Sequence, residues 1–145
     1  MRGRPRAAAN ERGIAALEFV LMLPFVLMVM FGIVDVSLLL CDKAVITNAA
    51  GEAARQGVVL SVPRASGSSI QAVAVSYAQN SLITGGTATT PSVDVVPSGG
   101  CPSTGTGNTL QVTVTYTYRG LVLGSALSAL AGPVTITAAA VKYCE

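Results

Sequence analysis

Residues 13–59 of the chain read GIAALEFVLMLPFVLMVMFGIVDVSLLLCDKAVITNAAGEAARQGVV. Every residue from 19 to 34 is apolar, Gly or Pro, and residues 14–41 carry only two charges, Glu18 and Asp35. A helix of about 28 residues is roughly 42 Å long, which exceeds the roughly 30 Å hydrocarbon core of a bilayer. The stretch therefore predicts one transmembrane helix over residues 14–41.

The helical pattern continues beyond this apolar run. Residues at helical spacing form one face built mostly of small side chains: Ile46, Ala49, Ala50, Ala53 and Gly57. Such a face lets another element approach closely. We predict one helix from about residue 14 to about residue 59, half in lipid and half outside it. Pro24 should kink this helix, because proline removes a backbone hydrogen bond.

The rest of the chain predicts a small domain. A proline and a glycine in residues 61–69 end the first helix, and Ser68 or Ser69 can cap a second one, whose apolar residues are Ile70, Val73, Ala74, Tyr77 and Ala78. Three β-type runs follow: SVDVV (92–96), TLQVTVTYTY (109–118) and PVTITAAAVKY (133–143). The predicted fold class is α+β, with the long helix packed on the second helix and a small antiparallel sheet.

This pattern divides the chain into four predicted segments. They are a basic leader (1–13), a transmembrane helix (14–41), its continuation outside the membrane (42–59) and a small α+β domain (60–145). The glycine-broken apolar segment RGLVLGSALSALAG (119–132) fits a short helical turn or a membrane-facing loop equally well.

Composition argues against an enzyme. The chain is 51% hydrophobic and 11% charged and has no His, which removes the commonest general base and metal ligand. It has no Gly-rich phosphate loop, paired metal-ligand spacing or nucleophile elbow. We therefore expect no catalytic residues, no metal and no cofactor.

The charge of the N-terminus predicts topology. The four arginines of the leader are Arg2, Arg4, Arg6 and Arg12, opposed by one acidic residue. They form a short patch without aromatic residues, so we expect no nucleic-acid binding. A basic flank beside a membrane helix keeps that end in the cytoplasm. The C-terminal domain is then expected outside it.

The cysteines fit that compartment, where disulfides persist. If the two longer strands pair with Leu110 near Lys142, Cys144 lies close to the loop that contains Cys101. We therefore predict a Cys101–Cys144 disulfide. Cys41 is left as a small apolar residue or, less favoured, an intersubunit bridge.

Two other interpretations of the N-terminus are weaker. The apolar run is too long for a secretory signal, and no A-x-A site follows it. A lipoprotein box ending at Cys41 would need a small residue at the preceding position, which is Leu40.

Glu18 poses the sharper question, because a charge at the start of an apolar helix is expensive. Gly13 stands five residues before it, Phe19 follows it, and a cut after Gly13 would make Ile14 a new N-terminal amine. That amine could pair with Glu18 of a neighbouring subunit. Otherwise, Glu18 is a helix-end residue that reaches water by snorkelling.

The pattern Gly13, Glu18, Phe19 between a basic leader and an apolar helix resembles the processing site of type IV pilin-like proteins, especially those of Tad (tight adherence) systems. The segment NAAGEAARQGVV (48–59) is similar to TadE-like minor pilins, and the chain is longer than a major Flp pilin. The resemblance implies a minor pilin or pseudopilin processed at Gly13, Ile14, Glu18 and Phe19, acting in assembly of a Flp-type pilus.

The implied partners are the membrane, a prepilin peptidase, other pilin-like subunits and the pilus assembly platform of this secretion system. The implied location is the cytoplasmic membrane, single-pass, with the N-terminus inside and the domain outside. The alternative is an unprocessed membrane-anchored binding or secretion-accessory domain. Asp35 is expected to reach the outer headgroups, with an assembly role as the lesser interpretation.

Overall fold

A computed structural model describes residues 7–83, 89–102, 107–122, 124 and 132–145, with side chains from residue 13 onward. The chain forms two compact units, Met1–Val34 and Asp35–Glu145. The first helix, α1, spans Ala7–Val58 and contributes to both units.

The sequence predicts a start of α1 near residue 14, but the helix begins at Ala7. Residues 7–9 are alanines, which have the highest helix propensity, so the helix extends into the predicted leader. It continues past Pro24 and ends at Val58, close to the predicted end.

The sheet has three antiparallel strands, β1 (Ser92–Val96), β2 (Thr109–Tyr118) and β3 (Val134–Tyr143), in the order β1-β2-β3. The predicted register is confirmed, because Leu110 lies opposite Lys142 and Tyr118 opposite Val134. Alternate β2 residues are buried, namely Leu110, Val112, Val114, Tyr116 and Tyr118. The α+β fold class is therefore confirmed.

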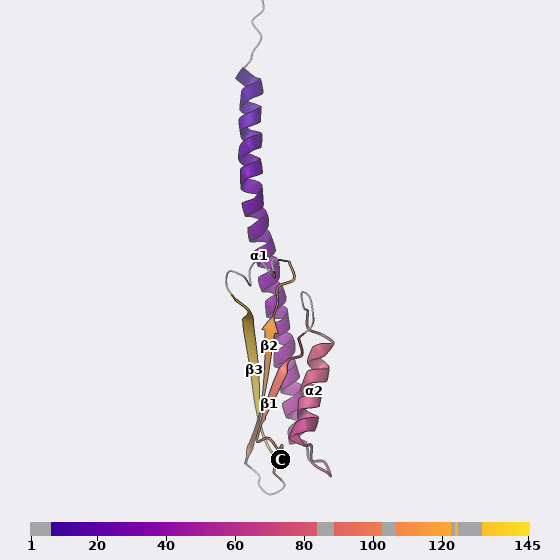
Figure 1. Cartoon of the computed structure of the whole chain (residues 1–145). Helices are drawn as coiled ribbons and strands as arrows, with labels where there is room; N and C mark the ends of the chain where they lie inside the picture. The colour runs from indigo at the N-terminus through magenta and orange to yellow at the C-terminus, as the bar shows by residue number, and fades with distance from the viewer. Residues whose placement is uncertain (1–6, 84–88, 103–106, 123, 125–131) are drawn as a thin grey trace, which may run out of the picture. The chain divides into compact units, whose positions relative to one another are not determined.

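The small-residue face of α1 packs where the sequence predicts. Ile46, Ala49 and Ala53 are fully buried, in the part of α1 that runs along the sheet (Figure 1). A methyl group built on Gly57 would overlap the side chains of Leu110 and Ile70. Small residues thus let α1 lie close to both β2 and the second helix.

Helix α2 (Gly67–Gln79) lies beside β1 and the C-terminal part of α1 (Figure 1). The predicted cap at Ser68 or Ser69 is wrong. Ser66 has an extended backbone, and its hydroxyl accepts the Ser69 N–H at 3.3 Å. Gly67, the first residue of α2, lies so close to the Ser98 carbonyl oxygen that a Cβ there would overlap it.

Candidate functional site

The predicted processing residues lie on one continuous stretch of α1 in the first unit. Gly13, Ile14, Glu18 and Phe19 are all exposed, and nothing lies within 4 Å of a Cβ built on Gly13. The helix is unbroken across the Gly13–Ile14 bond. The Gly13–Ile14 bond therefore lies within an exposed segment of regular helix.

Glu18 stands among exposed apolar side chains. Phe19 is 66% exposed and Phe25 is 65% exposed. In the described part of the chain, only α1 is long and apolar enough to cross a membrane. Only 6% of its most apolar 18-residue stretch is buried. Among the residues with described side chains, none forms an ion pair or hydrogen bond with Glu18.

The second unit holds two buried carboxylates, Asp35 and Asp42, seven residues apart on α1. Asp42 is fully buried, and its Oδ1 accepts the backbone N–H of Ile83 at 2.8 Å. Its Oδ2 has no hydrogen-bond partner in the described part of the chain. Burial raises the pKa of Asp42 above its ordinary value of 3.8.

The sequence predicts that Asp35 reaches the outer headgroups, but its side chain is turned into the second unit. It is 3% exposed, and its Oδ1 accepts the backbone N–H groups of Leu121 and Val122, each at 3.1 Å. The Tyr118 hydroxyl donates to the Asp35 carbonyl at 3.3 Å. The sequence pattern missed this role, because it gave no sign that the segment after β2 folds back onto α1.

Gly120 makes this contact feasible. A Cβ at Gly120 would lie 3.1 Å from Asp35 Oδ2 and 3.0 Å from the Gly124 Cα. These distances are tighter than ordinary van der Waals contact, so a side chain here would push the loop away from the carboxylate. We name Asp35, Tyr118, Gly120, Leu121 and Val122 the junction cluster.

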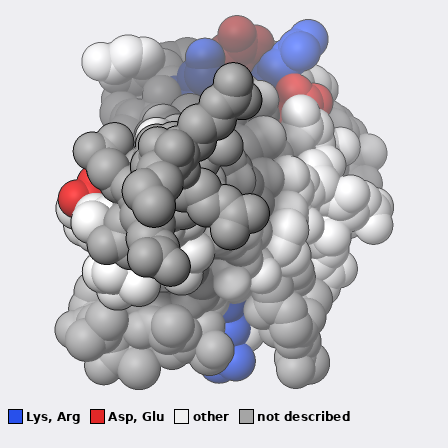
Figure 2. Space-filling view, turned by 90° about the horizontal axis from the view of Figure 1, so that it is seen from above, with Lys and Arg blue, Asp and Glu red and all other residues white. Residues whose placement is uncertain are grey.

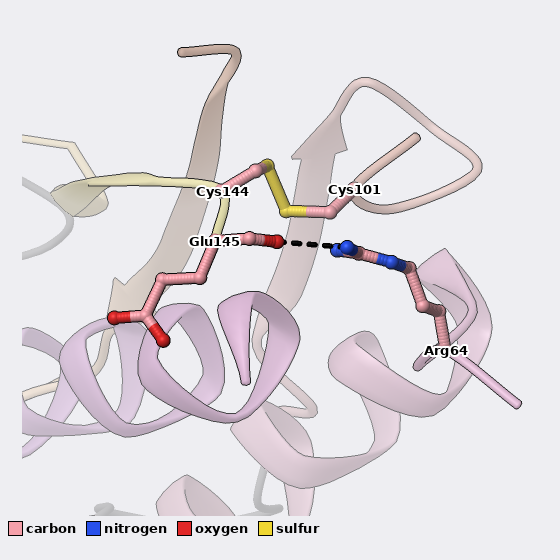
Figure 3. The surroundings of a disulfide bond; sticks show 4 residues. All are labelled: Arg64, Cys101, Cys144 and Glu145. Carbon is pink, nitrogen blue, oxygen red and sulfur yellow. Dashed lines mark hydrogen bonds between the residues drawn. A yellow bond between two sulfur atoms is a disulfide. The ribbon is translucent and has the colours of Figure 1, made fainter. Parts of the chain in front are cut away.

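At the opposite end of α2 and the sheet, a disulfide joins Cys101 to Cys144, with their Cα atoms 5.8 Å apart. Figure 3 shows Arg64 reaching past it, and Arg64 Nη2 donates to the main-chain oxygen of Glu145 at 2.7 Å. The Cys144 N–H donates to the Asn108 carbonyl at 2.7 Å. These bonds tie the end of β3 to two loops. Cys41 is a free, exposed thiol.

Two hollows lie on the surface of the described residues. A hollow of about 320 Å³ between α1 and α2 and another of about 650 Å³ near Cys101 are lined by no ionisable side chain. No group of three His, Cys, Asp or Glu among the described residues could hold a metal ion. In the view of Figure 2, described acidic and basic side chains are interspersed and form no patch of one sign.

Comparison with known protein families finds a match to one part of the chain. Residues 13–55 match the family model described as TadE-like protein. Comparison with curated proteins and with solved structures found no match. The matched segment runs along α1 from Gly13 through most of the buried small-residue face. Residues 13–55 are therefore similar to TadE-like proteins, and this likeness covers the part of α1 that begins at Gly13.

Proposed function

We propose that this chain is a minor pilin or pseudopilin that is cut after Gly13 by a prepilin peptidase and acts in assembly of a Flp-type pilus. One observation carries the proposal: the TadE-like match over residues 13–55 coincides with Gly13, Glu18 and Phe19 at the start of an exposed apolar helix.

The surroundings of Gly13 support a role in recognition by another protein rather than in folding. Glycine inside a helix costs roughly 0.5–1 kcal/mol relative to alanine. Nothing in the described structure comes within 4 Å of a Cβ at Gly13, so packing does not require glycine there. A peptidase that must approach the backbone closely does require it.

Glu18 would act after cleavage. The new amine of Ile14 is a cation, and the Glu18 carboxylate of a neighbouring subunit can neutralise it. A buried charge with a partner is tolerated, whereas one without a partner is strongly penalised. Such pairing between subunits would set the axial register of an assembling filament.

The division of the chain into two units supports a shorter membrane segment than the apolar run alone suggests. Because Asp35 is buried in the second unit, we place the hydrocarbon-spanning part at residues 14–34 rather than 14–41. A helix of about 21 residues is roughly 31 Å long, which matches a bilayer core. The leader arginines would hold the N-terminus in the cytoplasm, with the second unit outside. The partners would be the peptidase, other pilin-like subunits and the assembly platform.

Variants at the two positions separate recognition from assembly. Gly13→Val should block cleavage, because a branched side chain hinders close backbone approach. Glu18→Ala should leave at least some cleavage yet abolish piliation, and Glu18→Gln should fail likewise, because an amide cannot neutralise the amine. Processing is measured by mass spectrometry alongside a count of surface pili.

Glu52→Ala is the matched control, because Glu52 is an exposed carboxylate on the same helix whose nearest cation is Arg55 at 4.0 Å. It should be processed and piliated normally. Normal piliation with Glu18→Ala would show that the carboxylate only reaches the headgroups, and would remove the assembly role.

A further inference from the structure

The loop after β2 is fastened to α1 at the first residue beyond the apolar run. Asp35 follows Val34 directly, and its carboxylate holds the backbone N–H groups of Leu121 and Val122. Tyr118 and Gly120 complete the contact. The loop is thus fixed beside the point where α1 passes from its apolar stretch into the second unit.

The side chains of this loop point away from the core. Leu121 is 53% exposed and Val122 is 44% exposed, although the backbone beside them is held in place. Arg119, two residues before Leu121, is exposed too. Two adjacent apolar side chains exposed together are unfavourable in water.

The backbone chemistry fits contact with lipid. An amide N–H that enters the apolar layer without an acceptor costs several kcal/mol, which excludes most loops from that layer. Here Asp35 accepts the N–H groups of both exposed residues. The loop can therefore bury its side chains in lipid without stranding these two donors.

We propose that residues 119–122 form a second membrane contact, in which Leu121 and Val122 insert into the interfacial layer of the bilayer that α1 crosses. The inference rests on the proposed membrane insertion of α1. Asp35 is the positioning residue, and Arg119 lies where a lipid phosphate can meet it. The contact would fix the height of the second unit at the membrane surface before assembly.

The chain provides an optical test, because it contains no Trp. We would introduce one Trp at a time into the full chain, as Leu121→Trp, Leu27→Trp or Leu60→Trp. Leu60 is 66% exposed and lies 25 residues beyond Asp35 in sequence, roughly 35–40 Å away if measured at helical rise. Leu60→Trp is thus the matched control, an exposed leucine remote from the junction cluster, and Leu27→Trp reports the helix.

Each variant is reconstituted in vesicles of phosphatidylcholine with a minority of phosphatidylglycerol, with or without bromine on the acyl chains near the glycerol. Interfacial apolar groups lie roughly 5–10 Å below the headgroup boundary, so Leu121→Trp emission should be blue-shifted and fall about twofold in brominated lipid. Leu27→Trp should be quenched as well, and Leu60→Trp should not.

Quenching of Leu27→Trp without quenching of Leu121→Trp would overturn the inference and leave the membrane helix intact. Absence of quenching at Leu27→Trp would overturn both. In the Leu121→Trp background, Asp35→Ala should abolish the quenching, while Asp35→Asn, which keeps an acceptor oxygen, should retain it. Equal quenching in the Asp35→Ala and Asp35→Asn variants would overturn the positioning role of Asp35.

Discussion

Replacing Cys101 and Cys144 together with serine should destabilise the second unit strongly. The disulfide joins residues 43 apart in sequence. Closing a loop of this size removes about 13 cal/mol/K of entropy from the unfolded chain, which corresponds to about 4 kcal/mol at 25 °C. For a unit of this size, a loss of about 4 kcal/mol lowers the melting temperature by roughly 15–25 °C.

The assay is thermal unfolding of the full chain in detergent micelles, followed by circular dichroism. The double variant and the reduced wild-type chain should melt together, well below the oxidised chain. Cys41→Ser is the matched control and should not change the melting temperature, because Cys41 is free and exposed. Thiol labelling of the unreduced chain should modify Cys41 alone. Coincident melting of the oxidised chain and the double variant, or equal labelling of all three cysteines, would refute the reasoning.

Three further predictions concern the buried positions Asp42 and Gly67, and the same unfolding assay checks all three. Because burial raises the pKa of Asp42, the free energy of unfolding should fall as pH rises from about 3.8 through the raised pKa of the folded state. Asp42→Asn should remove this fall. A fall that persists in this variant would show that Asp42 is not its source. Asp42→Ala should cost about 1–3 kcal/mol, because the Ile83 N–H loses its acceptor. Gly67→Ala should lower the free energy of unfolding by about 1–3 kcal/mol, since the new Cβ would overlap the Ser98 carbonyl oxygen. Gly51→Ala is the control and should be neutral or stabilising, because nothing lies within 4 Å of a Cβ at Gly51. Equal effects of the two substitutions would show that packing does not require glycine at position 67.

Local patterns in the sequence were sufficient to predict much of the fold. Alternation along residues 109–118 predicted the central strand, and the spacing of Ile46, Ala50 and Gly57 predicted the face of α1 that packs on it. The pairing of β2 with β3 followed because each strand has a single apolar face, which restricts the register.

Features that depend on contacts between distant segments could not be predicted in the same way. The close approach of Gly67 to Ser98 joins segments far apart in sequence, and the burial of Asp35 depends on a loop that returns after β2. The predicted conformation of 119–132 remains open in part, because residues 123 and 125–131 lie outside those described. The processing site rests on residue pattern and family resemblance, since a peptidase substrate is defined by its enzyme.

The mature N-terminal residue tests the central proposal most directly. The chain would be purified from cells with and without an active prepilin peptidase, and its N-terminal peptide identified by mass spectrometry. We predict Ile14 as the first residue when the peptidase is active, and an uncut Gly13–Ile14 bond when it is not. A chain that keeps this bond in the presence of the active peptidase would contradict the account and favour an unprocessed membrane anchor.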